Sequence, residues 1–312
     1  MATENLSDMS PPSGDQFEIG HGRHHAVVTE IGATLRLYTV NDVPVIEGFA
    51  ADAMCDSGRG QVLAPWPNRL DSGSYRFGDR EARAALDEPE RHNAIHGLVR
   101  WLPWHVVARA QNVVTMGCVI HPQPGYPWRL LLTVEYRLGR DGLAVTAQAT
   151  NLDTDAAPFG IGFHPYLSVP APTVDTSSLV IPARRRLVTD ERGLPIRNIP
   201  VAGTEYDFTA RRWIGATRLD TAYTDLVRDE DGIARVELDD PAGQRGATVW
   251  MDARFTHVMA FTGDTLEPPS RRRTSIALEP MTCPPDALRS GEDIVTLEPG
   301  NSWEGRWGIE PR

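Results

Sequence analysis

The chain has 312 residues, of which 41% are hydrophobic and 23% are charged, a composition typical of a globular protein with a full core. Its formal net charge of −11 argues against nucleic acid or an anionic membrane as the main partner, because both would require an extended basic face. The sequence contains no lysine, which excludes Schiff-base and pyridoxal-phosphate chemistry and also a P-loop that depends on its lysine.

The N-terminal segment, Met1 to Gln16, is polar, contains prolines and has no apolar run. We therefore expect residues 1–16 to form a disordered tail rather than a signal peptide, and residues 17–312 to form a single domain. No later stretch approaches the run of about 18 apolar residues that a membrane-spanning helix needs. The cysteines form no Cys-x-x-Cys pair, so we expect a reducing compartment, the cytoplasm.

Apolar and polar residues alternate with a period of two along much of the chain. The runs 130–138 and 143–149 each place their apolar side chains on one face, and the Gly139–Gly142 segment between them predicts a hairpin. The same pattern predicts further strands at 236–238, 247–251, 255–261, 276–279 and 302–309. Glycine (27) and proline (25) are spread throughout, as expected for short strands joined by turns. We predict an all-β fold, a large and mainly antiparallel β-sandwich.

The local sequence around Glu279 indicates a functional side chain. It alternates with Ile276 and Leu278 along an extended run, and Pro280 restricts the backbone before it to β or polyproline geometry. This arrangement presents one carboxylate at a strand end, as a catalytic base requires. The alternative is an edge-strand glutamate that faces water.

Two histidines lie in stiff segments next to glycine or proline. His96 follows Ile95 and precedes Gly97, and His164 lies in Gly-Phe-His-Pro-Tyr. Gly97 places the His96 imidazole at a strand or turn edge, and the stiffness of the His164 segment suits a side chain that must hold one orientation. Either residue could equally be a structural histidine of the core.

Two further motifs are candidates for binding. Arg69 follows Pro-Trp66-Pro-Asn68, and an aromatic face beside a fixed guanidinium suits a polyhydroxylated ligand. Asp220 lies in Leu-Asp-Thr-Ala-Tyr. The alternatives are a packed tryptophan with a surface arginine, and an aspartate in a turn or cap.

The sequence offers no metal site and no cofactor motif. His21, His24 and His25 cluster near the N-terminus without a matching ligand set, so we expect no metal. The chain lacks a Gly-x-Ser-x-Gly elbow. The segment 160–165 superficially resembles a dinucleotide fingerprint, but proline replaces its third glycine.

Five short motifs follow one another along the chain: Pro-Trp-Pro-Asn-Arg69, Ile-His96-Gly, Gly-Phe-His164-Pro-Tyr, Leu-Asp220 and Leu-Glu279-Pro-x-Thr. This ordered set resembles the aldose 1-epimerase (galactose mutarotase) family over roughly residues 17–309. The resemblance implies a large β-sandwich that interconverts the α and β anomers of a free aldose without a cofactor or a metal.

Matched by position, the resemblance implies a catalytic set of Glu279, His164 and His96. Glu279 would remove the proton of the anomeric hydroxyl, and His164 would protonate the ring oxygen. After ring opening, rotation about C1–C2 and closure onto the other face give the other anomer. His96 would hold sugar hydroxyls and the ring oxygen. We also expect a neighbouring carboxylate to raise the pKa of His164 and keep it protonated.

The resemblance assigns substrate binding to Arg69 and Asp220, with Trp66 and Asn68 in the same site. We predict a monosaccharide substrate, a neutral aldohexose such as glucose or galactose, because Arg69 is the sole arginine within these motifs. A mutarotase for a sulfonated or otherwise anionic sugar is an alternative, since two motifs look closer to a branch that includes sulfosugar mutarotases.

Two other classes remain open at this stage. A non-catalytic carbohydrate-binding protein would explain Trp66, Arg69 and Asp220. A glycoside hydrolase would use Glu279 and Asp220 as its pair of carboxyl groups. The oligomeric state stays open between a monomer and a homodimer.

Overall fold

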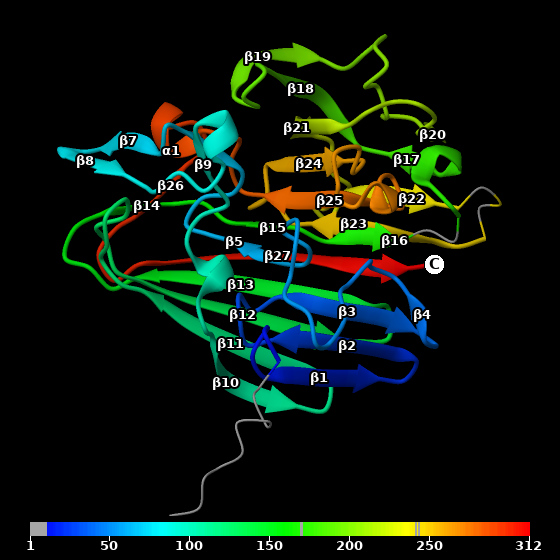
Figure 1. Cartoon of the computed structure of the whole chain (residues 1–312), viewed down its shortest axis with the longest axis horizontal. Coiled ribbons are helices and arrows are strands. Elements are labelled where there is room, and N and C mark those ends of the chain that lie inside the picture. Colours follow the sequence, from blue (N-terminus) through cyan, green and yellow to red (C-terminus); the bar gives the residue numbers. More distant parts are fainter. Residues whose placement is uncertain (1–10, 169–170, 241, 243) are drawn as a thin grey trace, which may run out of the picture.

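The computed structural model describes residues 11–168, 171–240, 242 and 244–312, and these residues form an all-β fold (Figure 1). The predicted fold class is confirmed. One antiparallel sheet has nine strands in the order β10 (His105–Ala110), β11 (Val113–Ile120), β12 (Leu130–Leu138), β13 (Leu143–Asn151), β27 (Ser302–Pro311), β23 (Gly246–Met251), β22 (Ala234–Asp239), β17 (Ser178–Val180) and β20 (Arg212–Trp213).

The second large sheet has eight strands. Its order is β19 (Pro195–Pro200), β18 (Ala183–Thr189), β21 (Asp220–Leu226), β24 (His257–Phe261), β25 (Ser275–Met281), β15 (Gly162–Phe163) and β5 (Val62–Leu63), with β16 (Tyr166–Ser168) also paired to β25. The hairpin predicted around Gly139–Gly142 joins β12 to β13, where Leu138 pairs with Leu143.

Smaller sheets complete the described fold. The N-terminal sheet lies beside β11 and β12 (Figure 1) and contains β1 (Gln16–His21), β2 (His24–Thr29), β3 (Leu35–Val40) and β4 (Val43–Pro44). Three short pairs are β6 (Arg69–Asp71) with β9 (Asn93–Ile95), β7 (Ser74–Phe77) with β8 (Arg80–Arg83), and β14 (Ala157–Phe159) with β26 (Val295–Leu297). The short helices are η2 (Pro89–Arg91), η3 (Val99–Trp101), η4 (Val174–Thr176), η5 (Pro269–Arg271) and α1 (Ala287–Ser290).

The folded region begins before residue 17. Residues 1–10 of the expected tail lie outside the described residues, whereas Ser13 is buried and Gln16 begins β1. Ile31 donates its backbone N–H to the Ser13 carbonyl at 3.0 Å, and Glu30 donates to the Asp15 carbonyl at 2.7 Å. The polar composition that predicted disorder up to residue 16 did not reveal these backbone hydrogen bonds.

One hydrophobic core joins the two large sheets. Phe163 of β15 and Trp307 of β27 have ring centroids 5.0 Å apart, and both belong to a buried cluster that extends from residue 19 to residue 309. This shared core supports the single domain that we propose.

Strand β25 determines where the functional site lies. Its side chains alternate between two environments: Ile276 and Leu278 belong to the main core, whereas Ala277 belongs to a separate cluster on the other face of the sheet. Because side chains alternate along a strand, Glu279 shares the face of Ala277. The eight-stranded sheet therefore carries the core on one face and Glu279 on the other.

Candidate active site

A pocket of about 480 Å³ lies over the face of the eight-stranded sheet that carries Glu279. Its volume falls within the range of about 300–1,000 Å³ that is usual for small-molecule sites. Six of the predicted site residues line it, from segments far apart in the chain: Asn68, Arg69, His96, His164, Asp220 and Glu279.

Sheet register brings the acidic residues to this face. Met259 pairs with Glu279, and Phe261 pairs with Asp220, so β21, β24 and β25 present these side chains next to one another. The β6–β9 strand pair supplies the opposite wall of the pocket, where Arg69 pairs with Ile95.

Glu279 is buried and aimed at a histidine. Its side chain is 2% exposed, and its Oε1 lies 3.3 Å from Nε2 of His164. The other oxygen, Oε2, is buried and accepts no hydrogen bond from any described residue. A buried acceptor without a partner is costly, so Oε2 is ready to accept a hydrogen bond from a ligand hydroxyl.

Burial decides the protonation of this pair. Desolvation, reinforced by the charge of Asp220, raises the pKa of Glu279 well above its usual range, although Arg69 opposes the shift. Desolvation, together with the charges of Arg100 and Arg59, lowers the pKa of His164 to about 3. The expectation that a neighbouring carboxylate keeps His164 protonated is therefore wrong, because the loss of hydration outweighs the attraction.

The pair nevertheless keeps one exchangeable proton near neutral pH. A protonated Glu279 beside a neutral His164 contains the same number of protons as a carboxylate beside an imidazolium. One proton transfer across the 3.3 Å contact interconverts the two arrangements.

Backbone hydrogen bonds and close packing position His164. Its backbone N–H donates to the Gln61 carbonyl at 3.1 Å, and its carbonyl accepts from Gly60 at 2.9 Å. Its ring stacks on Tyr166, with centroids 4.9 Å apart and planes 15° apart. Gly58, at a φ of +73°, passes so close that an added Cβ would lie 2.8 Å from Cδ2 of the imidazole.

His96 is a neutral hydrogen-bond donor. The backbone N–H of Asn68 donates to its Nδ1 at 3.1 Å, so the ring proton of the neutral imidazole is carried by Nε2. Burial, with charges from Arg100, His164 and Arg69, holds the pKa of His96 well below its usual value. Its ring stands edge-on to His164 at 5.4 Å.

Arg69 is fixed by Glu88, a residue that sequence reasoning missed. Nε of Arg69 donates to Glu88 Oε2 at 2.9 Å and Nη2 donates to Oε1 at 3.0 Å. Asp220 lies farther away, with Oδ2 3.9 Å from Nη1. Glu88 has no motif around it and lies 19 residues from Arg69, at the start of η2. An acidic residue next to Pro89 was the only local signal.

Trp66 is not brought to the pocket. It is 2% exposed and belongs to the main hydrophobic core, so it does not supply the aromatic face expected beside Arg69. Three other aromatic residues line the pocket: Trp101, Tyr166 and Phe261. Trp101 is 51% exposed, and neither its sequence position nor its neighbours had indicated it.

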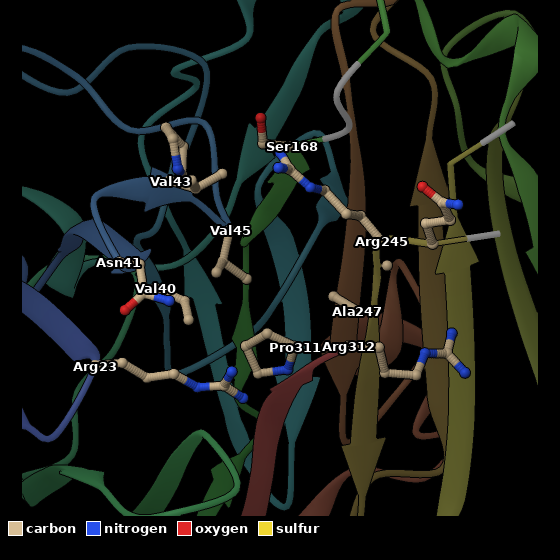
Figure 2. Close-up of a pocket in the computed structure, with 13 residues that line it drawn as sticks. Arg23, Val40, Asn41, Val43, Val45, Ser168, Arg245, Ala247, Pro311 and Arg312 are labelled. Atoms are coloured by element: carbon tan, nitrogen blue, oxygen red, sulfur yellow. The ribbon is translucent and has the colours of Figure 1, made fainter. Parts of the chain in front are cut away.

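A larger pocket, of about 610 Å³, lies between β3–β4 and the C-terminal end of the chain (Figure 2). Its ionisable side chains are arginines: Arg23, Arg245 and Arg312. The described residues that line it include neither a carboxyl side chain nor an imidazole, and therefore offer no pair of groups for acid–base chemistry. The pocket over Glu279, which places a carboxyl group beside an imidazole, is the candidate active site.

The fold and this site together define a class of protein. A buried carboxyl group, two neutral imidazoles and a fixed guanidinium in one concave pocket are typical of an enzyme that moves protons on a small polar molecule. The chain belongs to the aldose 1-epimerase family, whose model matches residues 15–310, and it is an isomerase of that family. Among the described residues, no helix is long and apolar enough to cross a membrane.

The chain is similar over most of its length to a protein of known sequence and to several solved structures. The uncharacterized protein YihR of Escherichia coli K12 is 31% identical over 289 residues, covering 92% of this chain and 90% of YihR. A GalM/aldose epimerase homologue from C. elegans superposes with a TM-score of 0.85 at 17% identity, covering 96% of this chain and 98% of that one. The galactose 1-epimerase of Lactobacillus acidophilus NCFM gives a TM-score of 0.80 at 17% identity, with coverages of 95% and 94%. At these identities the solved structures show the shared fold.

Proposed function

We propose that the protein interconverts the α and β anomers of a free, neutral aldohexose such as glucose or galactose, by acid–base opening and closing of the sugar ring. The observation that carries this proposal is the buried contact between Glu279 and His164 at 3.3 Å. Ring opening requires one group that removes a proton from the anomeric hydroxyl and another that delivers a proton to the ring oxygen.

The two groups can exchange roles without a proton from solvent. In the ion-pair arrangement, the Glu279 carboxylate accepts the proton of the C1 hydroxyl while the His164 imidazolium protonates the ring oxygen. The C1–O5 bond breaks, C1 becomes an aldehyde, and the proton count of the pair is unchanged. After rotation about C1–C2, the reverse transfers close the ring on the other face.

Binding of the sugar favours the ion-pair arrangement. Sugar hydroxyls that donate to Oε2 of Glu279 stabilise its carboxylate, as the nearby Arg69 does. Nε2–H of His96 is a fixed donor for a sugar oxygen. Asp220, with a side chain 45% exposed at the pocket, is an acceptor for sugar hydroxyls.

The charge balance of the pocket wall supports a neutral sugar. Among its described residues, Arg69 pairs with Glu88 at 2.9 Å, and Arg100 pairs with Asp87 at 2.8 Å. Arg91 lies 3.9 Å from Glu88. Because each guanidinium of the wall already lies beside a carboxylate, with Glu88 shared by Arg69 and Arg91, a buried sugar anion would have to compete with these carboxylates for a cation.

The arginine run at 184–186 does not change this balance, because none of its residues lines the pocket. Arg184 lies 3.4 Å from Asp225 on the surface, and Arg186 packs over the ring of Tyr206.

The three cysteines are buried and unpaired, which supports the cytoplasm as the proposed compartment.

A non-catalytic carbohydrate-binding protein would have no use for a buried carboxyl group in contact with a buried imidazole. Polarimetry on freshly dissolved α-glucose and α-galactose tests the proposal. We expect the optical rotation to reach its equilibrium value faster with the protein than without it, and in proportion to protein concentration. A rate equal to the spontaneous rate for every aldohexose would refute it.

A further inference from the structure

We propose that Arg192 is a positioning residue, which fixes the guanidinium of Arg69 in the pocket through contacts on both of its sides. Arg192 does not line the pocket. It lies in the turn between β18 and β19, about a hundred residues away in sequence from the segment that it contacts. Its expected effect on activity rests on the proposed function, whereas its effect on Arg69 does not.

Arg192 connects β6 to the segment that joins η2 to β9. Its Nε donates to the carbonyl of Arg91 at 2.9 Å, and its Nη2 donates to Oδ1 of Asp71 at 2.7 Å. Nη2 also donates to the His92 carbonyl at 2.9 Å and to Oδ1 of Asn93 at 3.1 Å. In return, Nδ2 of Asn93 donates to the Arg192 carbonyl at 2.9 Å. Nη2 has two N–H groups, so its three acceptors share them; together with the bond from Nε, these contacts specify a single docked position of the turn.

The turn itself is stiff. Oδ1 of Asp190 accepts the backbone N–H groups of Arg192 and Leu194, each at 2.9 Å. The N–H of Gly193 donates to the Asp190 carbonyl at 3.0 Å, and Gly193 has a φ of +78°. Docking of Arg192 therefore fixes the position of Gly193.

Gly193 packs against one side of the Arg69 side chain. A Cβ added at Gly193 would lie 2.6 Å from Nη1 of Arg69 and 2.9 Å from its Cδ, so only a glycine allows the turn to approach this closely. The turn covers the stem and head of Arg69, whose side chain is 11% exposed.

Glu88 holds the other side of the Arg69 guanidinium, and Asn93 connects Glu88 to Arg192. Nδ2 of Asn93 donates both to Oε2 of Glu88, at 3.0 Å, and to the Arg192 carbonyl. Glu88 in turn accepts two hydrogen bonds from Arg69. In Arg192→Ala the bond from Asn93 Nδ2 to the carbonyl of residue 192 remains, but the turn loses the guanidinium bonds to Asp71, Arg91 and His92, and Oδ1 of Asn93 loses its donor. The turn is then held less firmly, so Arg69 becomes more exposed to solvent and can adopt more rotamers. A guanidinium that must be reordered for each sugar stabilises the transition state less.

A double-mutant cycle on the full chain tests this role. Arg192→Ala should lower kcat/KM about tenfold, equivalent to about 1.4 kcal/mol. Arg69→Met should lower it further, and the double variant should be no slower than Arg69→Met alone, because Arg192 acts only through Arg69. The matched control is Arg197→Ala, an exposed arginine on β19 of the same hairpin, which should leave activity unchanged. Additive losses in the double variant overturn the proposal.

Two further measurements keep the test decisive if a variant is unstable or the substrate is different. Gly193→Ala retains Arg192 but crowds Arg69, and should reproduce the loss. The ¹H–¹⁵N signal of the Arg69 Nε–H group, identified by its absence in Arg69→Met, should shift in Arg192→Ala and in Gly193→Ala but not in Arg197→Ala. This signal needs no catalysis, so it separates an error about Arg192 from an error about mutarotation. An unmoved signal in Arg192→Ala overturns the proposal.

Discussion

Nε2 of His164 lies 3.3 Å from Oε1 of Glu279, and the two side chains are 7% and 2% exposed. Burial disfavours the charged form of both residues. The pair is therefore most stable when its one proton is on Glu279 and both side chains are neutral. The proposed reaction uses that same proton.

Replacing Glu279 by Gln should lower kcat/KM by about 10² to 10⁴, the usual worth of a general acid or base. Glutamine keeps the shape and the hydrogen-bonding oxygen but cannot take up a proton. Polarimetry measures the rate, and calorimetric titration with the sugar should show that binding survives. More than about half of the activity remaining would remove Glu279 from the mechanism.

The pH profile should show no inflection near 6.5, the ordinary pKa of histidine. The active pair contains one proton; it gains a second only as pH falls toward the His164 pKa of about 3, and it loses its own only above the raised pKa of Glu279. We expect kcat/KM to stay level through the region around pH 6.5 where an ordinary histidine titrates, after subtraction of spontaneous mutarotation. His164→Asn should abolish most activity; more than about half of the activity remaining in this variant would assign the acid role to His96.

Gly58 should be required for the orientation of His164. In Gly58→Ala, the new Cβ would lie 2.8 Å from the imidazole, so we expect a fall of tenfold or more in kcat, roughly 1.4 kcal/mol. Gly22→Ala is the matched control: its φ is also positive, +57°, but an added Cβ meets nothing within 4 Å. Gly22→Ala therefore introduces the strain of a positive φ without a steric clash. Equal activities in the two variants would contradict the role of Gly58.

Buried histidines should make the protein sensitive to acid. Burial lowers the pKa of His257 to about 4, although Asp293 opposes the shift. Below pH 6.5 the unfolded chain binds a proton at this residue that the folded protein does not, so the free energy of unfolding falls as pH falls from about 6.5 to 4. Each such histidine contributes a slope of up to about 1.4 kcal/mol per pH unit.

Urea unfolding at several pH values between 7 and 4.5 measures that slope. His257→Asn should reduce the slope by up to the contribution of one proton, while replacement of the exposed His121 should leave the slope unchanged. Equal slopes for the wild type and His257→Asn would show that His257 is protonated in the folded protein.

The sequence predicted what depends on local pattern and missed what depends on contacts between distant segments. The strands were predictable because alternation with a period of two records which face is buried, and Glu279 was found on this basis. Trp66 was misplaced because a rigid Pro-Trp-Pro segment does not say whether its ring faces the core or the pocket. Glu88 and Arg192 were missed because their partners lie 19 and about 100 residues away.

The pKa of His164 was predicted with the wrong sign for the same reason. The neighbouring carboxylate was inferable from the motifs, but the degree of burial was not. Burial comes from the stacked ring of Tyr166 and the close passage of Gly58, which only the folded chain brings together. Desolvation is then the largest influence on the imidazole.

The last prediction concerns the charge of the substrate. NMR exchange spectroscopy on glucose, galactose and sulfoquinovose at equal concentration should show faster anomer exchange for a neutral hexose, because Arg69 and Arg100 are already paired with Glu88 and Asp87. Exchange of the sulfonated sugar more than about tenfold faster, a transition-state preference of roughly 1.4 kcal/mol, would reverse this conclusion. Arg100 would then be the residue to test, since its buried Nε has no hydrogen-bond partner among the described residues. Under that outcome, Arg100→Met should slow the sulfonated sugar alone, whereas under the neutral prediction it should affect the three sugars alike.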